Sequence, residues 1–165
     1  MEIERKFLVK DLNKVKEIIK LAKKKEIIQD YLYIDDYTVV RKRKIVEEKI
    51  IKYKYTVKTM KTGISVNEFE KEITEREYEK LQINNKYFTL KKDRYIIPYF
   101  NNLNIELDIF HDIYEGVIFA EIEFKDEIQA NEMEIPNWFY KDISNLYTNS
   151  QMAFENLKEN IIREK

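Results

Sequence analysis

The sequence predicts an α+β protein built on an antiparallel sheet or barrel, and three observations favour this class. Most of the chain consists of segments rich in β-branched and aromatic residues. Short polar joins, such as Asn101-Asn102, separate several of these segments and favour antiparallel hairpins. Segments with helical periodicity are few, and they do not alternate with strands in a βαβ rhythm.

The first elements follow from periodicity and capping residues. Residues 1–9 alternate as a strand, and residues 11–25 are expected to be a helix. Asp11 is its expected N-cap, and Lys23 to Lys25 would lie at the negative end of its dipole. The other expected strands are residues 27–35, 37–45, 50–60, 64–73, 87–91, 94–99, 104–110 and 117–125.

Three further helices are expected between and after these strands. Thr74 and Glu77 form a capping-box pattern that begins a short helix over residues 74–81. A second short helix is expected over residues 137–146, directly after a proline. Residues 150–163 carry an apolar stripe at helical spacing and are expected to form the last helix.

Composition limits both the size and the chemistry of the protein. The 165 residues are 44% hydrophobic and contain no linker rich in glycine, proline or serine, so we expect one domain over residues 1–165. There is no cysteine, His111 is the single histidine, and Gly63 and Gly116 are the two glycines. Disulfides, zinc sites of Cys or several His, and glycine-rich phosphate loops are therefore excluded. The chemistry that remains is that of carboxylates, lysines, arginines and hard metal ions.

Charge is nearly balanced overall but is sorted by sign along the strands. There are 30 Lys and Arg residues against 31 Asp and Glu residues. Residues two apart share one face of a strand, and on most strands the charges that share a face have one sign. The acidic sets are Glu2/Glu4, Glu68/Glu70, Glu106/Asp108 and Glu121/Glu123, and the basic sets are Arg41/Arg43, Lys52/Lys54/Lys58 and Lys92/Arg94.

Two interpretations of these charged faces are open. The charged face of a half-buried sheet ordinarily points to water. Neighbouring like charges repel, however, so sorted sets favour ligands that offset the repulsion: cations for the acids and an anion for the bases. If the sheet curls into a barrel with helices outside, the charged face lines the interior. Carboxylates without His or Cys select Mg²⁺ or Mn²⁺, and clustered Lys and Arg select a phosphate chain.

An ordered series of motifs along nearly the whole chain resembles the CYTH superfamily, the triphosphate tunnel metalloenzymes. The series begins with an ExExK pattern at residues 2–6. It continues with Gln29-Asp-Tyr-Leu32, Val40-Arg-Lys-Arg43, Thr56-Val-Lys58, Glu68-Phe-Glu70, Lys92-Asp-Arg-Tyr95, Glu106-Leu-Asp108, Glu121-Ile-Glu123 and Tyr147-Thr-Asn-Ser150. The resemblance implies an eight-stranded antiparallel barrel that forms a tunnel with a charged lumen, with helices packed outside.

The resemblance also implies a role for each matching residue. The implied catalytic residues are Glu2, Glu4, Lys6, Glu121 and Glu123. The implied ligands of Mg²⁺ or Mn²⁺ are Glu2, Glu4, Asp108, Glu121 and Glu123. The implied substrate-binding residues are Lys6, Arg41, Arg43, Lys58, Lys92 and Arg94, with Glu68, Glu70 and Glu106 as second-rank candidates.

Three candidate functions are open, and triphosphate hydrolysis, which the resemblance implies, is preferred because the short chain resembles bacterial triphosphatases. The favoured substrate is inorganic tripolyphosphate, with ATP and thiamine triphosphate as the other triphosphates. One alternative is a class IV-type adenylyl cyclase, which converts ATP to cyclic AMP and pyrophosphate. Another is a non-catalytic phosphate, nucleotide or nucleic-acid binding module with stacking tyrosines, although acidic strands would repel a phosphate backbone in the absence of metal.

Two positions depart from the pattern of short bacterial members. Val66 stands where those proteins often carry a basic residue, and Asn145 stands where they often carry a lysine. Fewer cations would change how the phosphate chain is held, so substrate choice depends on these two positions.

The cellular setting follows from the absence of apolar runs. No ~20-residue apolar segment is present, and the first nine residues include several charged side chains. Neither a membrane span nor a signal peptide is therefore expected. We expect a cytoplasmic monomer or homodimer that binds a small triphosphate and has no nucleic-acid or membrane partner.

Overall fold

A single antiparallel sheet forms the body of the protein in the computed structural model, which describes residues 3–60 and 66–165. The strands of these residues are β1 (Ile3–Leu8), β2 (Lys23–Ile34), β3 (Thr38–Glu47), β4 (Ile50–Met60), β5 (Val66–Ile73), β6 (Leu90–Pro98), β7 (Asn104–His111), β8 (Ile118–Phe124) and β9 (Lys141–Asp142). Their order in the sheet is β5-β4-β3-β2-β6-β7-β8-β1-β9. The predicted α+β class with an antiparallel sheet is confirmed.

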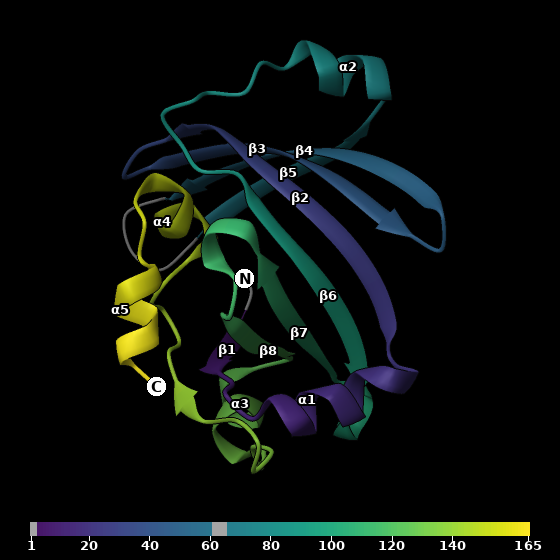
Figure 1. Cartoon of the computed structure of the whole chain (residues 1–165), viewed down its shortest axis with the longest axis vertical. Helices are drawn as coiled ribbons and strands as arrows, with labels where there is room; N and C mark the ends of the chain where they lie inside the picture. Colours follow the sequence, from purple (N-terminus) through teal and green to yellow (C-terminus); the bar gives the residue numbers. More distant parts are fainter. Residues whose placement is uncertain (1–2, 61–65) are drawn as a thin grey trace.

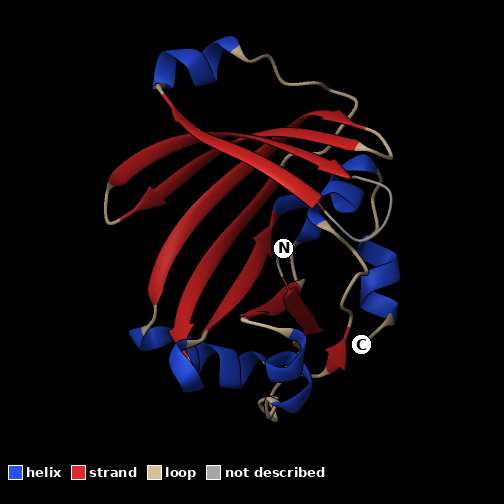
Figure 2. Cartoon of the chain, turned by 180° about the vertical axis from the view of Figure 1, so that it is seen from behind, coloured by secondary structure: helices blue, strands red, loops and turns tan. Residues whose placement is uncertain are grey.

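The sheet is strongly curved but stays open. Among the described residues, β5 and β9 are its edges and do not pair with each other. Two helices near the C-terminus lie on the side of the molecule opposite β2 and β6, beside the open side of the curve (Figure 1). The view from behind shows the same arrangement (Figure 2).

The helices are short, and most begin at a side-chain cap. They are α1 (Leu12–Ile18), α2 (Glu75–Lys80), α3 (Glu127–Glu132), α4 (Asn149–Phe154) and α5 (Lys158–Arg163), with single 3₁₀ turns η1 (Ile19–Leu21), η2 (Phe100–Asn102) and η3 (Asp112–Tyr114). Thr74 completes the predicted capping box of α2 with Glu77, and Thr148 caps α4 in the same way. No helix of the described chain is long and apolar enough to cross a membrane.

Each face of the sheet carries its own apolar core. On the outer face, Phe7, Ile105 and Ile122 pack with Val15 of α1 and Ala130 of α3. α2 lies over the outer face of β3 and β4, where the ring centroids of Tyr53 and Tyr78 are 4.8 Å apart.

The inner face is apolar at one end only. There Leu8, Tyr31 and Leu90 form a second core with Met152 of α4 and Ile161 of α5. α4 and α5 therefore cover the apolar end of the inner face, whereas α1 and α2 lie outside as expected, together with α3. The reason is that these apolar residues share the inner face with charged ones and need a cover of their own.

Two expected helices differ in the structure. The helix expected over residues 11–25 ends early, because Ala22 is already extended and Lys23–Lys25 pair with β6 in the sheet. Ladder hydrogen bonds outweigh the ~0.3–1 kcal/mol that lysines gain at a helix C-terminus. The helix expected over residues 150–163 is broken at Glu155, whose φ and ψ are −143° and 157°.

The chain between β8 and α4 also differs from expectation. Residues 137–146 form turns and the short strand β9 instead of a helix, because Lys141 and Asp142 pair with β1. α3 was not expected; its N-cap, Asp126, accepts a hydrogen bond of 2.7 Å from the backbone N–H of Gln129. The two strands expected over residues 87–91 and 94–99 are one strand, β6.

The break between α4 and α5 is held by a buried hydroxyl, and its removal should destabilise the fold. Tyr114 is fully buried; its hydroxyl donates to the carbonyl of Met152 at 2.5 Å and accepts from the N–H of Leu157 at 3.1 Å. Tyr114→Phe leaves these backbone groups unpaired, so we expect a loss of about 1–3 kcal/mol in urea unfolding. Tyr37→Phe, at a side chain that is 68% exposed, should change stability by less than about 0.5 kcal/mol. Equal unfolding midpoints for the two variants would contradict this account.

Candidate functional site

Strand register brings the sign-sorted side chains onto the inner face. Directly opposite residues of paired strands share a face, and Glu4 lies opposite Glu123 while Lys6 lies opposite Glu121. Further along the sheet, the directly opposite pairs are Glu106/Glu121, Arg94/Asp108, Arg41/Thr56, Arg43/Lys54, Lys58/Glu68 and Thr56/Glu70. The register therefore places every described candidate on one face, and Glu2 lies outside the described residues.

The inner face is divided into an acidic half and a basic half. The acidic half consists of β1, β7 and β8 with Glu4, Glu106, Asp108, Glu121 and Glu123; the basic half consists of β3, β4 and β6 with Arg41, Arg43, Lys58, Lys92 and Arg94. Lys6 lies among the acids, and Glu68 and Glu70 lie on β5 beside the bases.

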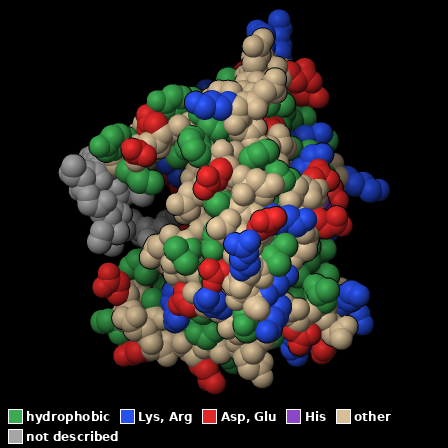
Figure 3. Space-filling model, turned by 60° about the vertical axis from the view of Figure 1, so that its left-hand side comes forward, with side chains coloured by type: hydrophobic (Ala, Val, Ile, Leu, Met, Phe, Trp, Pro, Cys, Tyr) green, Lys and Arg blue, Asp and Glu red, His purple; other side chains and the backbone are tan. Residues whose placement is uncertain are grey.

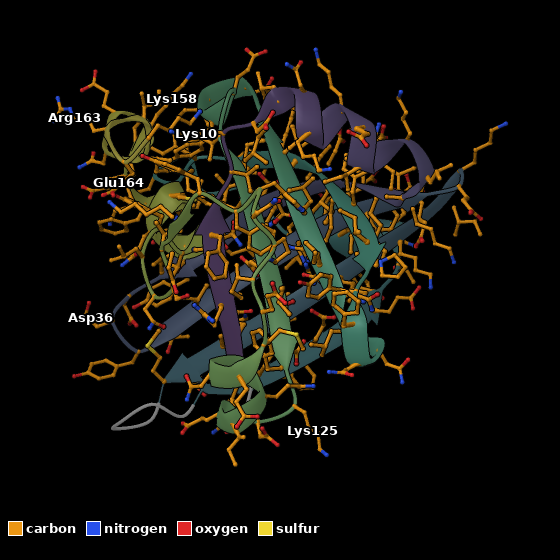
Figure 4. All side chains as sticks on the ribbon, turned by 90° about the horizontal axis from the view of Figure 1, so that it is seen from below. Lys10, Asp36, Lys125, Lys158, Arg163 and Glu164 are labelled. Carbon is orange, nitrogen blue, oxygen red and sulfur yellow. The ribbon has the colours of Figure 1, made fainter. Side chains whose placement is uncertain are left out.

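The outer surface has a different charge distribution. On the face shown in Figure 3, Lys and Arg side chains are interspersed with Asp and Glu side chains. Charged residues such as Asp36, Lys125 and Arg163 lie at the periphery of the molecule (Figure 4) and are exposed. The mixture of signs on this face contrasts with the sorted sets of the inner face.

Asp108 is the centre of a buried charge cluster that links the two halves. One of its carboxylate oxygens, Oδ2, lies 2.9 Å from Nζ of Lys92, and the side chains of these two residues are 3% and 1% exposed. Arg94 donates to both oxygens of the same carboxylate, at 2.8 and 2.9 Å. Arg94 also reaches Glu106, at 3.3 Å. Both oxygens of Asp108 are therefore engaged by cations of β6.

The pKa values of this cluster record the balance between burial and charge. Burial lowers the pKa of the Lys92 ammonium to about 8, against the opposing effect of Asp108. Burial alone would raise the pKa of Asp108, but Lys92 and Arg94 outweigh it and hold that pKa well below its usual range. The pKa of Glu121 is raised, first by burial and second by the negative charge of Asp108.

Lys6 is held by the chain near the C-terminus. Its Nζ donates to the backbone carbonyl of Tyr147 at 2.8 Å and lies 5.0 Å from the ring centre of Phe119. Burial lowers the pKa of Lys6, while Glu121 and Glu4 act in the opposite direction. A nearby phosphate would oppose the effect of burial and favour the charged form of this ammonium.

The basic half holds two arginines with unused donors. Arg41 is 8% exposed, and the Arg43 guanidinium lies 2.9 Å from a carboxylate oxygen of Glu70. Glu70 also accepts from Lys54 at 3.2 Å and from Thr56 at 3.0 Å. The Nε atoms of both arginines are buried without a hydrogen-bond partner. Such groups are rare in folded proteins, so each of these two donors needs an acceptor.

The donor chemistry of the acidic half fits a hard divalent cation. In the described part of the chain no three His, Cys, Asp or Glu residues are already arranged as a metal site. Glu4 and Glu123 are opposite each other and exposed, and Glu121 lies two residues along the same face. Their carboxylates are the oxygen donors that Mg²⁺ and Mn²⁺ prefer. The assignment of Asp108 as a further ligand stays a prediction, since its oxygens already accept from Lys92 and Arg94.

Three positions that contact these side chains had no role in the sequence assignment. The carbonyl of Tyr147 holds Lys6, the side-chain oxygen of Asn149 lies 3.5 Å from Nζ of Lys92, and Gln29 lies opposite Arg43. A backbone carbonyl leaves no trace in a sequence. Gln29 and Asn149 stand inside the motifs quoted above, which is the signal that could have found them.

The protein is similar to several solved structures, although its sequence matches no family model and no curated protein. The crystal structure of the inorganic triphosphatase NE1496 is similar, with a TM-score of 0.67 and 25% identity over 94% of this chain and 95% of that one. HpAC1 from Hippeastrum, a proposed adenylyl cyclase with a dominant triphosphatase activity, gives a TM-score of 0.57 and 13% identity over 79% and 83%. A proposed adenylate cyclase from Bacillus halodurans gives a TM-score of 0.54 and 17% identity, over 90% of this chain and 98% of that one.

These comparisons define a class of protein. The similar structures share a curved antiparallel sheet with this chain over most of the length of both partners. The predicted resemblance to the CYTH superfamily, the triphosphate tunnel metalloenzymes, is confirmed.

Loss of the central carboxylate should be costly because two buried cations depend on it. Asp108→Asn leaves Lys92 and Arg94 without their common partner, so we expect a loss of about 3–5 kcal/mol in urea unfolding at pH 7. Glu106→Gln removes a contact to the same arginine from a side chain that is 41% exposed and should cost less than about 1 kcal/mol.

The pH dependence of this loss gives an independent check. Because the folded pKa of Asp108 lies below its unfolded value of about 4, its contribution is complete above pH 4 and is lost as pH falls through the folded pKa. The stability difference between wild type and Asp108→Asn should therefore shrink in acid. A difference that stayed constant from pH 7 to pH 2 would contradict the charge assignment.

Proposed function

We propose that the protein is a metal-dependent triphosphatase that hydrolyses inorganic tripolyphosphate on its inner face. The observation that carries the proposal is the pair of arginines that β3 turns onto the inner face, with Arg41 8% exposed and the side chain of Arg43 11% exposed. A guanidinium offers a fork of donors that matches phosphate oxygens. The similarity to the structure of an inorganic triphosphatase supports the same substrate class.

The division of the inner face into acidic and basic halves suits an anhydride substrate. Arg41, Arg43 and Lys58 would bind the phosphate chain from β3 and β4, while Lys92 and Arg94 would face it from β6. These fixed cations stabilise charge that builds up on phosphate oxygens as the bond breaks. Asp108 keeps Lys92 and Arg94 in place through its two oxygens.

The acidic half would supply the metal site. Glu4, Glu121 and Glu123 would hold the divalent cation, together with Glu2 by sequence pattern. When bound, Mg²⁺ or Mn²⁺ neutralises phosphate charge and lowers the pKa of water. Glu121, whose pKa is raised by burial and by Asp108, would accept a proton more readily than an ordinary carboxylate. Lys6, opposite Glu121, carries positive charge into the acidic half.

A class IV-type adenylyl cyclase is the second candidate, because proteins described as adenylyl cyclases are among the similar structures. The same cations would then hold ATP so that its 3′-hydroxyl attacks the α-phosphate. The two activities differ in their products: hydrolysis of tripolyphosphate releases phosphate and pyrophosphate, whereas cyclisation of ATP releases cyclic AMP and pyrophosphate. A non-catalytic module would bind triphosphate and release neither.

The direct test measures product release together with loss of the proposed metal ligands. We expect the wild-type protein to release phosphate from tripolyphosphate only with Mg²⁺ or Mn²⁺, and to form less cyclic AMP from ATP under the same conditions. Glu4→Gln and Glu123→Gln keep the shape of the side chains but remove charge that holds a hard cation. Their turnover should fall by more than the ~10–100-fold that outer-shell changes cost.

The matched control is Glu17→Gln, the same chemical change on the outer helix α1, which should keep wild-type turnover. Dominant cyclic AMP formation would establish the second candidate instead. Binding of tripolyphosphate without any product would establish a binding module. Equal turnover in all four proteins would show that the acidic half is not the metal site.

The lowered pKa of Lys92 predicts proton uptake on substrate binding. Without ligand, Lys92 loses its proton as pH rises through about 8. A bound polyanion raises this pKa again, so binding above pH 8 should take up close to one proton, and affinity should fall as pH rises. Calorimetric titration with tripolyphosphate in two buffers of different ionisation enthalpy measures this uptake at pH 9. Lys92→Arg, which stays charged, should abolish this contribution; equal uptake by both proteins would exclude Lys92 as its source.

A further inference from the structure

Three buried polar atoms of the inner face lack hydrogen-bond partners, and one of them belongs to a residue without an assigned role. In the described part of the chain, the buried side-chain atoms without a partner are Oε1 of Gln29, Nε of Arg41 and Nε of Arg43. All three lie on adjacent strands β2 and β3. The set contains one acceptor and two donors. A small movement would therefore let the amide oxygen accept a hydrogen bond from an arginine Nε.

Register places the acceptor directly opposite one donor and diagonally from the other. Gln29 lies directly opposite Arg43, and Tyr31 lies directly opposite Arg41. Opposite side chains in an antiparallel pair have Cβ atoms about 4.5–5.5 Å apart, within reach of a hydrogen bond between long side chains. Gln29 is 0% exposed, so its amide acts on neighbouring side chains and not on solvent.

The other half of the Gln29 amide is already fixed. Its Nε2 donates to the hydroxyl of Tyr31 at 2.6 Å. Tyr31 lies directly opposite Arg41, and the positive charge of that guanidinium acts against burial, which raises the pKa of the Tyr31 hydroxyl. One neutral side chain is thus connected to the first arginine through Tyr31 and lies opposite the second arginine.

We propose that Gln29 is a positioning residue for the arginine pair: its Oε1 accepts a hydrogen bond from Nε of Arg43 when triphosphate binds, while its Nε2 holds Arg41 through Tyr31. This inference rests on the proposed function, since it names how the phosphate-binding arginines are oriented. A phosphate would accept hydrogen bonds from the terminal Nη atoms of each guanidinium. An acceptor bonded to Nε then fixes the plane in which those Nη donors lie.

The neutrality of the amide is part of the role. A carboxylate at this position would also accept from Nε, but it would neutralise arginine charge that the substrate needs. An isosteric acid should therefore weaken phosphate binding even though it keeps an acceptor in place. A side chain of similar length without hydrogen-bonding atoms should weaken binding because the guanidinium plane is no longer fixed.

The experiment combines calorimetric titration of inorganic tripolyphosphate with ¹H–¹⁵N spectra of the arginine Nε–H groups, both with Mg²⁺ present. Relative to wild type, Gln29→Met and Gln29→Glu should each raise Kd about tenfold or more, the scale of one charge-assisted hydrogen bond. In wild type, the Nε–H signal of Arg43 should shift and exchange more slowly on adding tripolyphosphate. Gln129→Glu, the same change of charge on the outer helix α3, should keep wild-type values.

The outcomes separate the two proposals. No binding of tripolyphosphate by wild type would overturn the proposed function, and the role of Gln29 with it. Tight binding by wild type and by both Gln29 variants, with the same Arg43 signal in each, would overturn the positioning role alone. Loss of affinity in a Gln29→Glu protein that keeps the wild-type unfolding midpoint would support the positioning role. If Gln29→Met does not fold, Gln29→Glu alone decides the test.

Discussion

The buried carboxylate of Asp108 is the contact on which the organisation of the inner face depends. A sheet that turns its charged side inward must compensate each buried charge, because an unpaired ion in the interior costs several kcal/mol. Asp108 meets this requirement for Lys92 and Arg94 together. It lies on β7 and they lie on β6, so one side chain joins the acidic and basic halves of the sheet. The cations of β3 and β4 then need no partner from β7, and Arg43 and Lys58 pair instead with Glu70 and Glu68 of β5.

Much of this arrangement could be predicted from period-2 patterning alone. Arg41 and Arg43, or Glu121 and Glu123, share parity, and the structure places each pair on one face. The strands were found because β-branched and aromatic residues mark them strongly. The ends of the strands do not follow from local preference. The lysines of Lys23–Lys25 are favourable at the C-terminus of a helix, but they form a strand because they pair with β6. Tertiary pairing therefore decided what local preference could not.

The cover of the inner face could not be predicted from the charges that defined it. Leu8, Leu90, Phe110 and Phe119 share parity with charged residues, a mixed pattern that signals an apolar patch inside the charged face. The chain that covers this patch is distant in sequence and irregular. α4 and α5 are separate because the hydroxyl of Tyr114 occupies the break between them. Backbone contacts of this kind, like the carbonyl of Tyr147 on Lys6, depend on the path of the chain.

The uneven distribution of the core has a consequence for the motion of the sheet. Both cores draw on β1, β7 and β8, whereas Thr56 is the one buried residue among the described side chains of β4 and β5. Amide hydrogens exchange first where few apolar contacts resist local opening. β4 and β5 therefore form the part of the sheet that opens at the lowest free energy. Bound polyanion, by bridging Arg41 and Lys58 to the rest of the inner face, would slow hydrogen exchange there more than elsewhere.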